Sequence, residues 1–133
     1  MMIPCEIAVK SVIPAIRACV AKELTQTYKM RQNDVADRLG ITQTAISKYV
    51  RDVRGHVVRI DQTEEIRSMM NKIVSQAAND KISRTQLTLG FCEVCKMVRR
   101  NGIMCELCKR SDPAIDIDLC KVCMSGPNCA TLE

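Results

Sequence analysis

Residues 32–51 read QNDVADRLGITQTAISKYVR, and this stretch decides the fold that we expect. Gly40 stands between two apolar patterns, where a helix C-terminus favours a left-handed residue. Thr42 offers a side-chain oxygen as the N-cap of a second helix. The inward stripes of the two helices are Val35, Ala36 and Leu39, and then Ala45, Ile46 and Tyr49. The stretch therefore predicts two short helices joined by a tight glycine turn, a helix-turn-helix.

The same residues resemble those of a known family. The order Gln32, Val35-Ala36, Leu39-Gly40, Ile41-Thr42-Gln43, Ile46-Ser47, Tyr49 is similar to the helix-turn-helix of phage-repressor-type (XRE-like) transcription regulators. The segment IPAIRACVAKEL before it and the Arg54-Gly55 pair after it resemble a group of predicted archaeal regulators with a Cys-rich tail. The resemblance covers residues 4–60 well and the tail loosely. It implies that the second helix is a recognition helix, with Gln32 helping to hold Gln43 and a phosphate.

Helical geometry indicates which side chains of the second helix are free to contact DNA. Gln43 can pair bidentately with adenine, and Lys48 or Arg51 can bind guanine or a phosphate. Other basic side chains, Lys29, Arg31, Arg54 and Arg59, are better placed for the DNA backbone. The expected DNA-binding residues are Gln32, Thr42, Gln43, Thr44, Ser47, Lys48, Arg51 and Arg54. The alternative is a plain helical hairpin within a helical core.

The distribution of charge favours the DNA-binding interpretation. The 133-residue chain has a net charge of +5, and residues 1–60 contain ten Lys/Arg against five Asp/Glu. Residues 61–90 contain four of each, and residues 91–133 contain six of each. All of the excess positive charge therefore lies in the first 60 residues, with the expected helix-turn-helix.

The composition also indicates the fold class. Because only 2% of the residues are aromatic, the core must come from aliphatic side chains and methionine, which favours helices.

Helices are also expected on both sides of this motif. The segment from Pro4 to Thr27 has the apolar spacing of a helix, which Pro14 divides. A helix over 63–78, capped by Thr63, carries an apolar face of Ile66, Met69, Met70, Ile73, Val74 and Ala77. That face is either simple core or the contact of a homodimer, which we expect because one helix-turn-helix covers only a half-site. The capping-box pattern of 83–86 predicts another short helix before Phe91.

Seven of the nine cysteines lie in the last part of the chain. They are Cys92 and Cys95, Cys105 and Cys108, Cys120 and Cys123, and the single Cys129. Two Cys-x-x-Cys pairs can complete a tetrahedral thiolate site. The spacing of the first two pairs is like that of a zinc ribbon, with Asn101-Gly102 as a hairpin turn. All seven cysteines are therefore candidate metal ligands.

The number of cysteines leaves the identity of the centre open. One tetrahedral site uses four of them, and the others could be spare, supply a second site or combine with another pair. Zinc and a [4Fe-4S] cluster both accept four thiolates, so we expect Zn²⁺ or a cluster equally. A thiol–disulfide switch without metal is the third interpretation. Of the two remaining cysteines, Cys19 falls near an apolar helix face and Cys5 has no assigned role.

The sequence thus predicts a mainly α protein with three parts. Residues 1–60 form a helix-turn-helix DNA-binding domain, 61–90 a linker and dimerisation helix, and 91–133 a Cys-rich metal-binding region. We expect a cytoplasmic, homodimeric transcription regulator of double-stranded DNA, whose metal centre stabilises the tail or senses redox or metal state. The alternative is a metal-dependent protein–protein adaptor. No enzyme activity or small-molecule substrate is expected, because the chain lacks a phosphate loop and a Ser/His/Asp set. No membrane association is expected, because no apolar run approaches the roughly 20 residues that a bilayer requires.

Overall fold

The structure, a computed structural model, describes residues 3–51, 59–60 and 63–125. This part of the chain is mainly helical and contains no strand, as the sequence predicts. The helices are α1 (Pro4–Lys10), α2 (Val12–Gln26), α3 (Gln32–Leu39), α4 (Gln43–Val50), α5 (Glu64–Ala78), α6 (Arg84–Arg100), α7 (Cys105–Ser111) and α8 (Val122–Ser125). No helix of the described ranges is long and apolar enough to cross a membrane.

The N-terminal segment is divided into α1 and α2 at Ser11, close to the predicted break at Pro14. Ser11 is buried, and its hydroxyl donates a hydrogen bond to the Ile7 carbonyl at 2.6 Å. Pro14 then lies in the first turn of α2. A proline is tolerated there because the first backbone N–H groups of a helix have no intrahelical partner.

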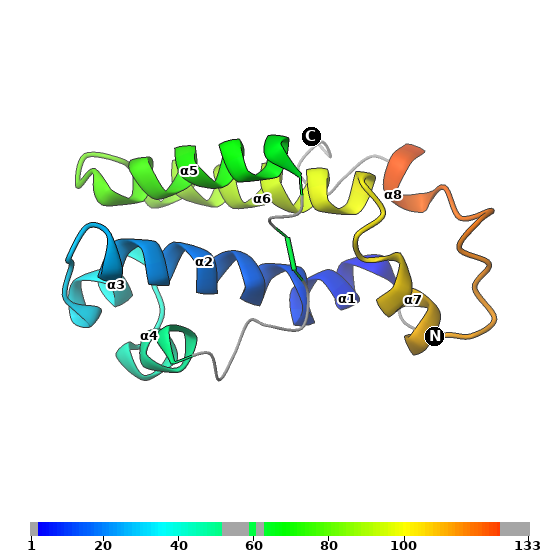
Figure 1. Cartoon of the computed structure of the whole chain (residues 1–133), viewed down its shortest axis with the longest axis horizontal. Coiled ribbons are helices and arrows are strands. Elements are labelled where there is room, and N and C mark those ends of the chain that lie inside the picture. The colour runs from blue at the N-terminus through cyan, green and yellow to red at the C-terminus, as the bar shows by residue number, and fades with distance from the viewer. Residues whose placement is uncertain (1–2, 52–58, 61–62, 126–133) are drawn as a thin grey trace.

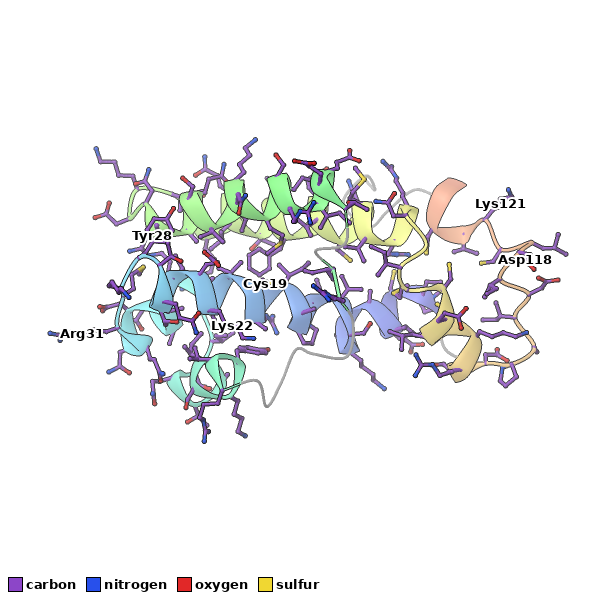
Figure 2. All side chains as sticks on the ribbon, in the orientation of Figure 1. Cys19, Lys22, Tyr28, Arg31, Asp118 and Lys121 are labelled. Atoms are coloured by element: carbon purple, nitrogen blue, oxygen red, sulfur yellow. The ribbon has the colours of Figure 1, made fainter. Side chains whose placement is uncertain are left out.

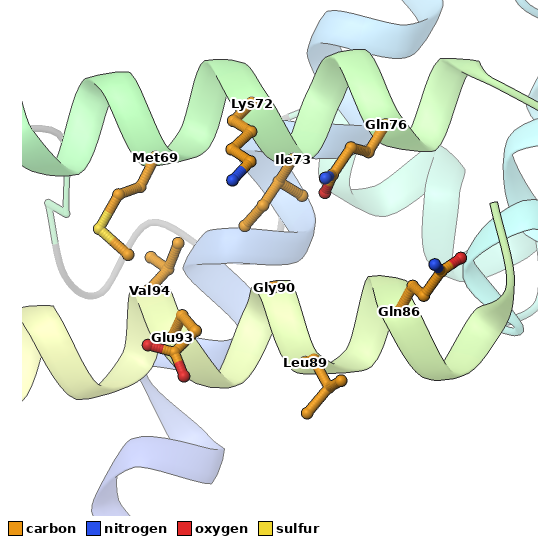
Figure 3. Close-up of a pocket in the computed structure, with 9 residues that line it drawn as sticks. All are labelled: Met69, Lys72, Ile73, Gln76, Gln86, Leu89, Gly90, Glu93 and Val94. Atoms are coloured by element: carbon orange, nitrogen blue, oxygen red, sulfur yellow. The ribbon is translucent and has the colours of Figure 1, made fainter.

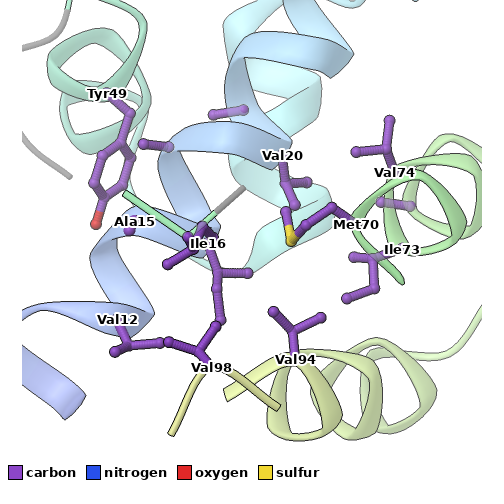
Figure 4. Packing of buried hydrophobic residues seen from close by; sticks show 14 of the residues in the cluster. Val12, Ala15, Ile16, Val20, Tyr49, Met70, Ile73, Val74, Val94 and Val98 are labelled. Carbon is purple, nitrogen blue, oxygen red and sulfur yellow. The ribbon is translucent and has the colours of Figure 1, made fainter. Parts of the chain in front are cut away.

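Helix α2 lies at the centre of the molecule and supplies most of its core. It packs against α4 on one side and against the antiparallel pair α5 and α6 on the other (Figure 1). Around its Ile16, side chains from the other helices close the interior, among them Met70, Val94 and Val98 (Figure 4). Residues from the ranges 1–60, 61–90 and 91–133 therefore contribute to one continuous apolar core.

The apolar face of α5 is used within the chain. Its buried side chains face α2 and α6, and they are Ile66, Met70, Ile73, Val74 and Ala77. Thr63 caps the helix as predicted, since its hydroxyl accepts a hydrogen bond from the Ile66 N–H at 3.2 Å. Of the two roles that the sequence allowed for this face, the fold gives it that of core.

Helix α6 is longer than the sequence predicted. Ser83 begins it with the predicted capping box, in which Ser83 Oγ accepts from Gln86 N and Gln86 Oε1 accepts from Ser83 N. The helix does not end before Phe91 but continues to Arg100, which makes it about 25 Å long. It continues because the apolar positions that face the core, Leu87, Val94 and Val98, keep a helical spacing and are buried, while Leu89 is exposed.

The helix-turn-helix and the cysteine pairs lie at opposite ends of the molecule. Helices α3 and α4 lie at one end of its long axis, and α7 and α8 lie at the other (Figure 1). Figure 2 shows Arg31, next to α3, far from Asp118 and Lys121 near α8. Helices α2 and α6 run along the axis between these ends, so they connect the two candidate sites.

Candidate nucleic-acid interface and cysteine cluster

The turn between α3 and α4 has the predicted local geometry. Gly40 is left-handed, with a φ of 68°, and its N–H donates a hydrogen bond to the Ala36 carbonyl. The next N–H, of Ile41, donates to the same carbonyl at 3.1 Å. Thr42 Oγ1 accepts from the N–H of Ala45 at 3.1 Å and so caps α4. The residues expected to end one helix and start the next therefore do so.

The predicted inward stripes meet the rest of the core. Val35, Ala36, Ile46 and Tyr49 are buried, and Leu39 and Ala45 are half-buried against the same core. Helix α4 packs on both α2 and α3, so these two helices hold its orientation. This support leaves the opposite side of α4 facing solvent.

The two glutamines that open these helices are hydrogen-bonded to each other. Gln43 Nε2 donates to Gln32 Oε1 at 2.8 Å. Gln32 is the first residue of α3 and is half-buried, while Gln43 is the first residue of α4 and is exposed. The bond restricts the rotamers of the Gln43 side chain. Gln43 Oε1 takes no part in this bond and can accept another one.

The outward side of α4 is polar. Thr42, Gln43, Thr44 and Arg51 are exposed, and Ser47 and Lys48 are half-buried. Arg51 lies along the helix end, where its Nε donates to the Ser47 carbonyl at 3.3 Å. One further predicted DNA-binding residue, Arg54, lies outside the described residues. The described members of the predicted set thus share one end of the molecule.

Two arginines join α3 to the α5–α6 pair, and sequence reasoning missed both. Arg38 Nη1 donates to the Ala77 carbonyl at 2.7 Å, in the last turn of α5. Arg84 Nη2 donates to the Asp37 carbonyl at 2.7 Å, in the last turn of α3. Each guanidinium satisfies a carbonyl that a helix end leaves without an intrahelical partner. No local pattern indicates these contacts, because their partners lie 39 and 47 residues away.

The first two cysteine pairs lie on helices, so the predicted zinc-ribbon hairpin is wrong. Cys92 and Cys95 belong to α6, and Cys105 and Cys108 belong to α7. Asn101 caps the end of α6, and Gly102 follows with a φ of 73°. The turn at Asn101-Gly102 therefore joins two helices, because burial of the apolar face of α6 extends that helix through its cysteine pair.

The second and third pairs line one small cavity between α7, α8 and the end of α6. Its volume is about 30 Å³, close to the share of one water molecule in the liquid. Cys108 is buried and the other three cysteines are half-buried. The residues around the cavity are Pro4, Arg99, Met104, Cys105, Cys108, Ile115, Ile117, Cys120 and Cys123.

The first pair is placed differently. Cys92 lines another cavity, of about 190 Å³, together with Arg17, Leu39 and Phe91 among others. Cys95 is half-buried against the apolar core. The third predicted group is incomplete, since Cys129 lies outside the described residues. Two of the three Cys-x-x-Cys pairs thus share a cavity that the other pair does not line.

Arg99 connects the cavity to the N-terminal helix. Its Nε donates to Cys123 Sγ at 3.4 Å, and its Nη1 donates to Cys5 Sγ at 3.6 Å. Partial burial lowers the pKa of Arg99, because it disfavours the charged guanidinium. The hydrogen bonds and charges of Cys123 and Cys5 have the opposite effect and together raise the pKa above its usual value. Cys5, which had no role in the sequence analysis, is therefore part of this end of the molecule. It is 94 residues from Arg99, so no sequence signal indicates the contact.

The thiols of Cys105 and Cys108 favour their protonated form. Burial raises the pKa of Cys108, and the charges of Cys123, Cys105 and Cys120 raise it further, against the lowering effect of Arg99. The pKa of Cys105 is raised by burial first and then by Cys123 and Cys120. Redox-active thiols have a lowered pKa, so these thiols are poor nucleophiles without a cation beside them.

The donor chemistry of the cavity fits a thiolate-bound metal. Sulfur ligands suit zinc and iron–sulfur clusters, and both take four of them. No disulfide links the four cysteines of the cavity. Across the described residues, no three Cys, His, Asp or Glu side chains converge closely enough to hold a metal ion. The four thiols of the cavity are therefore near one another but not in a ligating arrangement.

Comparisons of the chain with protein-family models, with curated proteins and with solved structures give no match.

Proposed function

We propose that the protein is a sequence-specific DNA-binding transcription regulator, and that a thiolate-bound metal centre, zinc or [4Fe-4S], stabilises its cysteine end or senses redox or metal state. The observation that carries the proposal is the polar outward side of α4. The opposite side of α4 is buried against the core, and Thr42 caps the start of the helix. Gln43, the first residue of α4, is hydrogen-bonded to Gln32, the first residue of α3. The excess positive charge of residues 1–60 lies with it.

In this proposal α4 enters the major groove. Gln43 and Thr44 lie at its N-terminal end, where recognition helices contact base edges. Lys48 and Arg51 follow one and two turns later and bind a guanine or a phosphate. Gln32 orients Gln43 through the 2.8 Å hydrogen bond between them. Arg31, exposed just before α3, binds the DNA backbone.

The test is binding to duplex DNA, first to a random-sequence pool from which the operator is selected. Neutralisation of several phosphates makes affinity fall steeply with salt concentration. Gln43→Ala with Lys48→Ala removes one base-reading side chain and one cation, and each good base contact contributes about 1–3 kcal/mol of discrimination. We therefore expect at least a tenfold loss of affinity for the selected operator.

A matched control removes the same two residue types elsewhere. Lys72 and Gln76 lie on α5, where they line a groove of about 380 Å³ between α5 and α6 (Figure 3). Helices α5 and α6 lie on the opposite side of α2 from α4 (Figure 1). Lys72→Ala with Gln76→Ala should leave affinity for the operator unchanged. Equal affinities of wild type and the Gln43/Lys48 variant would contradict the proposed recognition helix.

The centre itself is tested by anaerobic purification and metal analysis. Zinc without iron or sulfide, in colourless protein, identifies the first form of the centre. Iron with sulfide and a visible absorption band identifies the second. Protein that contains neither metal would exclude the centre and leave the DNA-binding part of the proposal intact.

We also propose that the regulator binds as a homodimer, because one helix-turn-helix covers only a half-site. The apolar face of α5 cannot supply the contact, since it is buried within the chain. Sedimentation or light scattering, with and without a two-half-site operator, measures the oligomeric state. A monomer that binds a single half-site with full affinity would contradict this part of the proposal.

Helix α6 provides a physical link by which the centre can act on DNA binding. Near its start Arg84 bonds the last turn of α3, and near its end Arg99 bonds Cys123. A displacement of α6 by metal loss would therefore change the support of the helix-turn-helix. We expect metal-free protein to bind the operator less tightly, and Arg84→Ala to reduce this difference. Equal affinities of loaded and metal-free protein would contradict sensing and leave the centre a structural role.

The adaptor is the competing function, and the salt dependence distinguishes it. An adaptor of this chain has no reason to bind duplex DNA with an affinity that falls steeply with salt. Absence of such binding, in protein with an intact metal centre, would favour the adaptor.

A further inference from the structure

One small cavity brings two of the three Cys-x-x-Cys pairs together. We propose that Cys105, Cys108, Cys120 and Cys123 hold one thiolate-bound metal centre, and that Cys92 and Cys95 are not ligands. This assignment rests on the metal-binding part of the proposed function and names its ligands. It differs from the zinc-ribbon interpretation of the sequence, which joins the first pair to the second.

Each pair can contribute two sulfur ligands to a single ion, although ligation requires the two pairs to move closer together. Cys105 and Cys108 are three residues apart on α7, so their side chains lie on the same face of the helix. Cys123 belongs to α8, and Cys120 lies two residues before the first residue of that helix. All four residues line the same cavity at the end of the molecule where α7 and α8 lie (Figure 1). Two pairs from two short helices form the donor set of a tetrahedral thiolate site.

The segment between the pairs allows the ligands to close around a metal. Residues 112–121 contain no helix and consist of short turns, in which Asp112 and Asp116 accept hydrogen bonds from backbone N–H groups two residues later. Such a segment can bring Cys120 and Cys123 toward α7 without disrupting a helix. The cavity that the two pairs line has a volume of about 30 Å³.

The charges around the cavity favour a bound cation. Metal binding requires the four thiols to be deprotonated, and four thiolates in one small space repel one another. Arg99 is the guanidinium beside them, 3.4 Å from Cys123 Sγ. One guanidinium cannot neutralise four thiolates, and a divalent ion or an iron–sulfur core would compensate the remaining negative charge. Arg99 then acts as a positioning residue, which donates a hydrogen bond to a ligand sulfur and tunes the centre.

The first pair lacks these features. Cys92 lines the larger cavity that Phe91 and Leu39 also line, on the side of α6 toward the helix-turn-helix. Cys95 packs half-buried against the apolar core and does not line the small cavity, although Arg99, which lines that cavity, lies beside it. The pair therefore belongs to the interface of α6 with α1 and α2 and not to the α7–α8 cavity.

Three double variants of the full chain test the assignment by metal analysis after anaerobic purification. Cys105→Ser/Cys108→Ser and Cys120→Ser/Cys123→Ser should each lose at least about tenfold in bound metal, since even outer partners of a metal contribute that much to affinity. The matched control, Cys92→Ser/Cys95→Ser, and the single variant Cys129→Ser should retain the wild-type stoichiometry. Loss of metal in either of these two, or wild-type protein without metal, overturns the assignment.

A second measurement uses wild-type protein and does not depend on the folding of a variant. Cysteine alkylation is followed by mass spectrometry before and after metal removal with a chelator. The reactivity of the four proposed ligands should rise on metal removal, and that of Cys92 and Cys95 should change little. A rise at Cys92 and Cys95 instead would overturn the assignment. Neither measurement involves DNA, so failure of the DNA-binding proposal is detected separately.

Discussion

The two ends of the molecule differ in what holds them together. At the helix-turn-helix end, α3 and α4 bury a continuous apolar stripe against α2, and each helix is capped or bonded at its termini. At the cysteine end, no described side chain after Cys108 is buried, and residues 112–121 form only turns. The comparison teaches that the first end can fold by apolar burial alone. The second has too little apolar surface and needs another source of stability, such as a metal.

Removal of the metal is the sharpest test of this difference, and its effect should be the largest. Structural zinc sites contribute about 10–16 kcal/mol of apparent binding energy in small zinc-finger peptides, and this energy is folding energy. A chelator should therefore remove nearly all hydrogen-exchange protection from α7 and α8. Amides of α3 and α4 are the internal control and should keep their protection. Unchanged protection of α7 would mean that packing, and not a metal, holds this end.

The second test disrupts the apolar end. Ile46 is fully buried on α4, and Ile46→Ala should lower the free energy of unfolding by about 2–5 kcal/mol, because it removes buried methyl groups and leaves a cavity. Chemical denaturation measures the loss. Thr44→Ala, at an exposed position of the same helix, should change stability by less than about 0.5 kcal/mol. If Ile46→Ala also lowers the metal content, the two ends are not independent.

The third test concerns the contact that joins the helix-turn-helix to α6. Gly40→Ala should cost about 1–2 kcal/mol, because an L-residue is strained in the left-handed region. Its Cβ would also lie 2.9 Å from Arg84 Cζ, so that guanidinium must shift. In an Arg84→Ala background only the backbone cost should remain. A double-mutant cycle on unfolding free energies measures the coupling between the two positions. If the effects of Gly40→Ala and Arg84→Ala are strictly additive, the close approach of Arg84 to Gly40 does not contribute to the cost of Gly40→Ala.

The smallest expected effect is that of a helix cap. Thr42→Ala removes the oxygen that accepts the Ala45 N–H and should destabilise the protein by about 1 kcal/mol. Thr42→Ser retains the oxygen and should cost less, so it is the matched control. Thermal or chemical unfolding compares the two variants. An equal loss for both would assign the effect to the threonine methyl group and not to the cap.

Helices α3 and α4 and the turn between them were predictable because all their signals are local. The apolar stripe, the left-handed Gly40 and the cap at Thr42 lie within 32–51, and each depends on neighbours a few residues away. The break between α1 and α2 and the capped start of α5 were predictable for the same reason. Whether the outward side of α4 binds DNA stays a prediction.

The cysteine end was predicted less well, because its signals conflict. The Cys-x-x-Cys at 92–95 is typical of a metal-binding turn, but the same residues lie in a helical pattern whose apolar positions are Leu87, Val94 and Val98. Burial of these three side chains decides in favour of the helix. The sequence could list seven candidate ligands but could not group them, since grouping depends on which helices meet.

The sequence by itself predicted the helices from α1 to α5 and the start of α6, most of their caps, the polar side of α4 and the presence of three cysteine pairs. Only the tertiary structure decided that α5 is core, that Arg38 and Arg84 join α3 to the α5–α6 pair, and that Cys105, Cys108, Cys120 and Cys123 line one cavity beside Arg99. The physical reason is the separation along the chain between the residues that interact. Caps, turns and helical stripes depend on residues within a few positions, whereas shared burial and the Cys5–Arg99 contact join segments far apart along the chain.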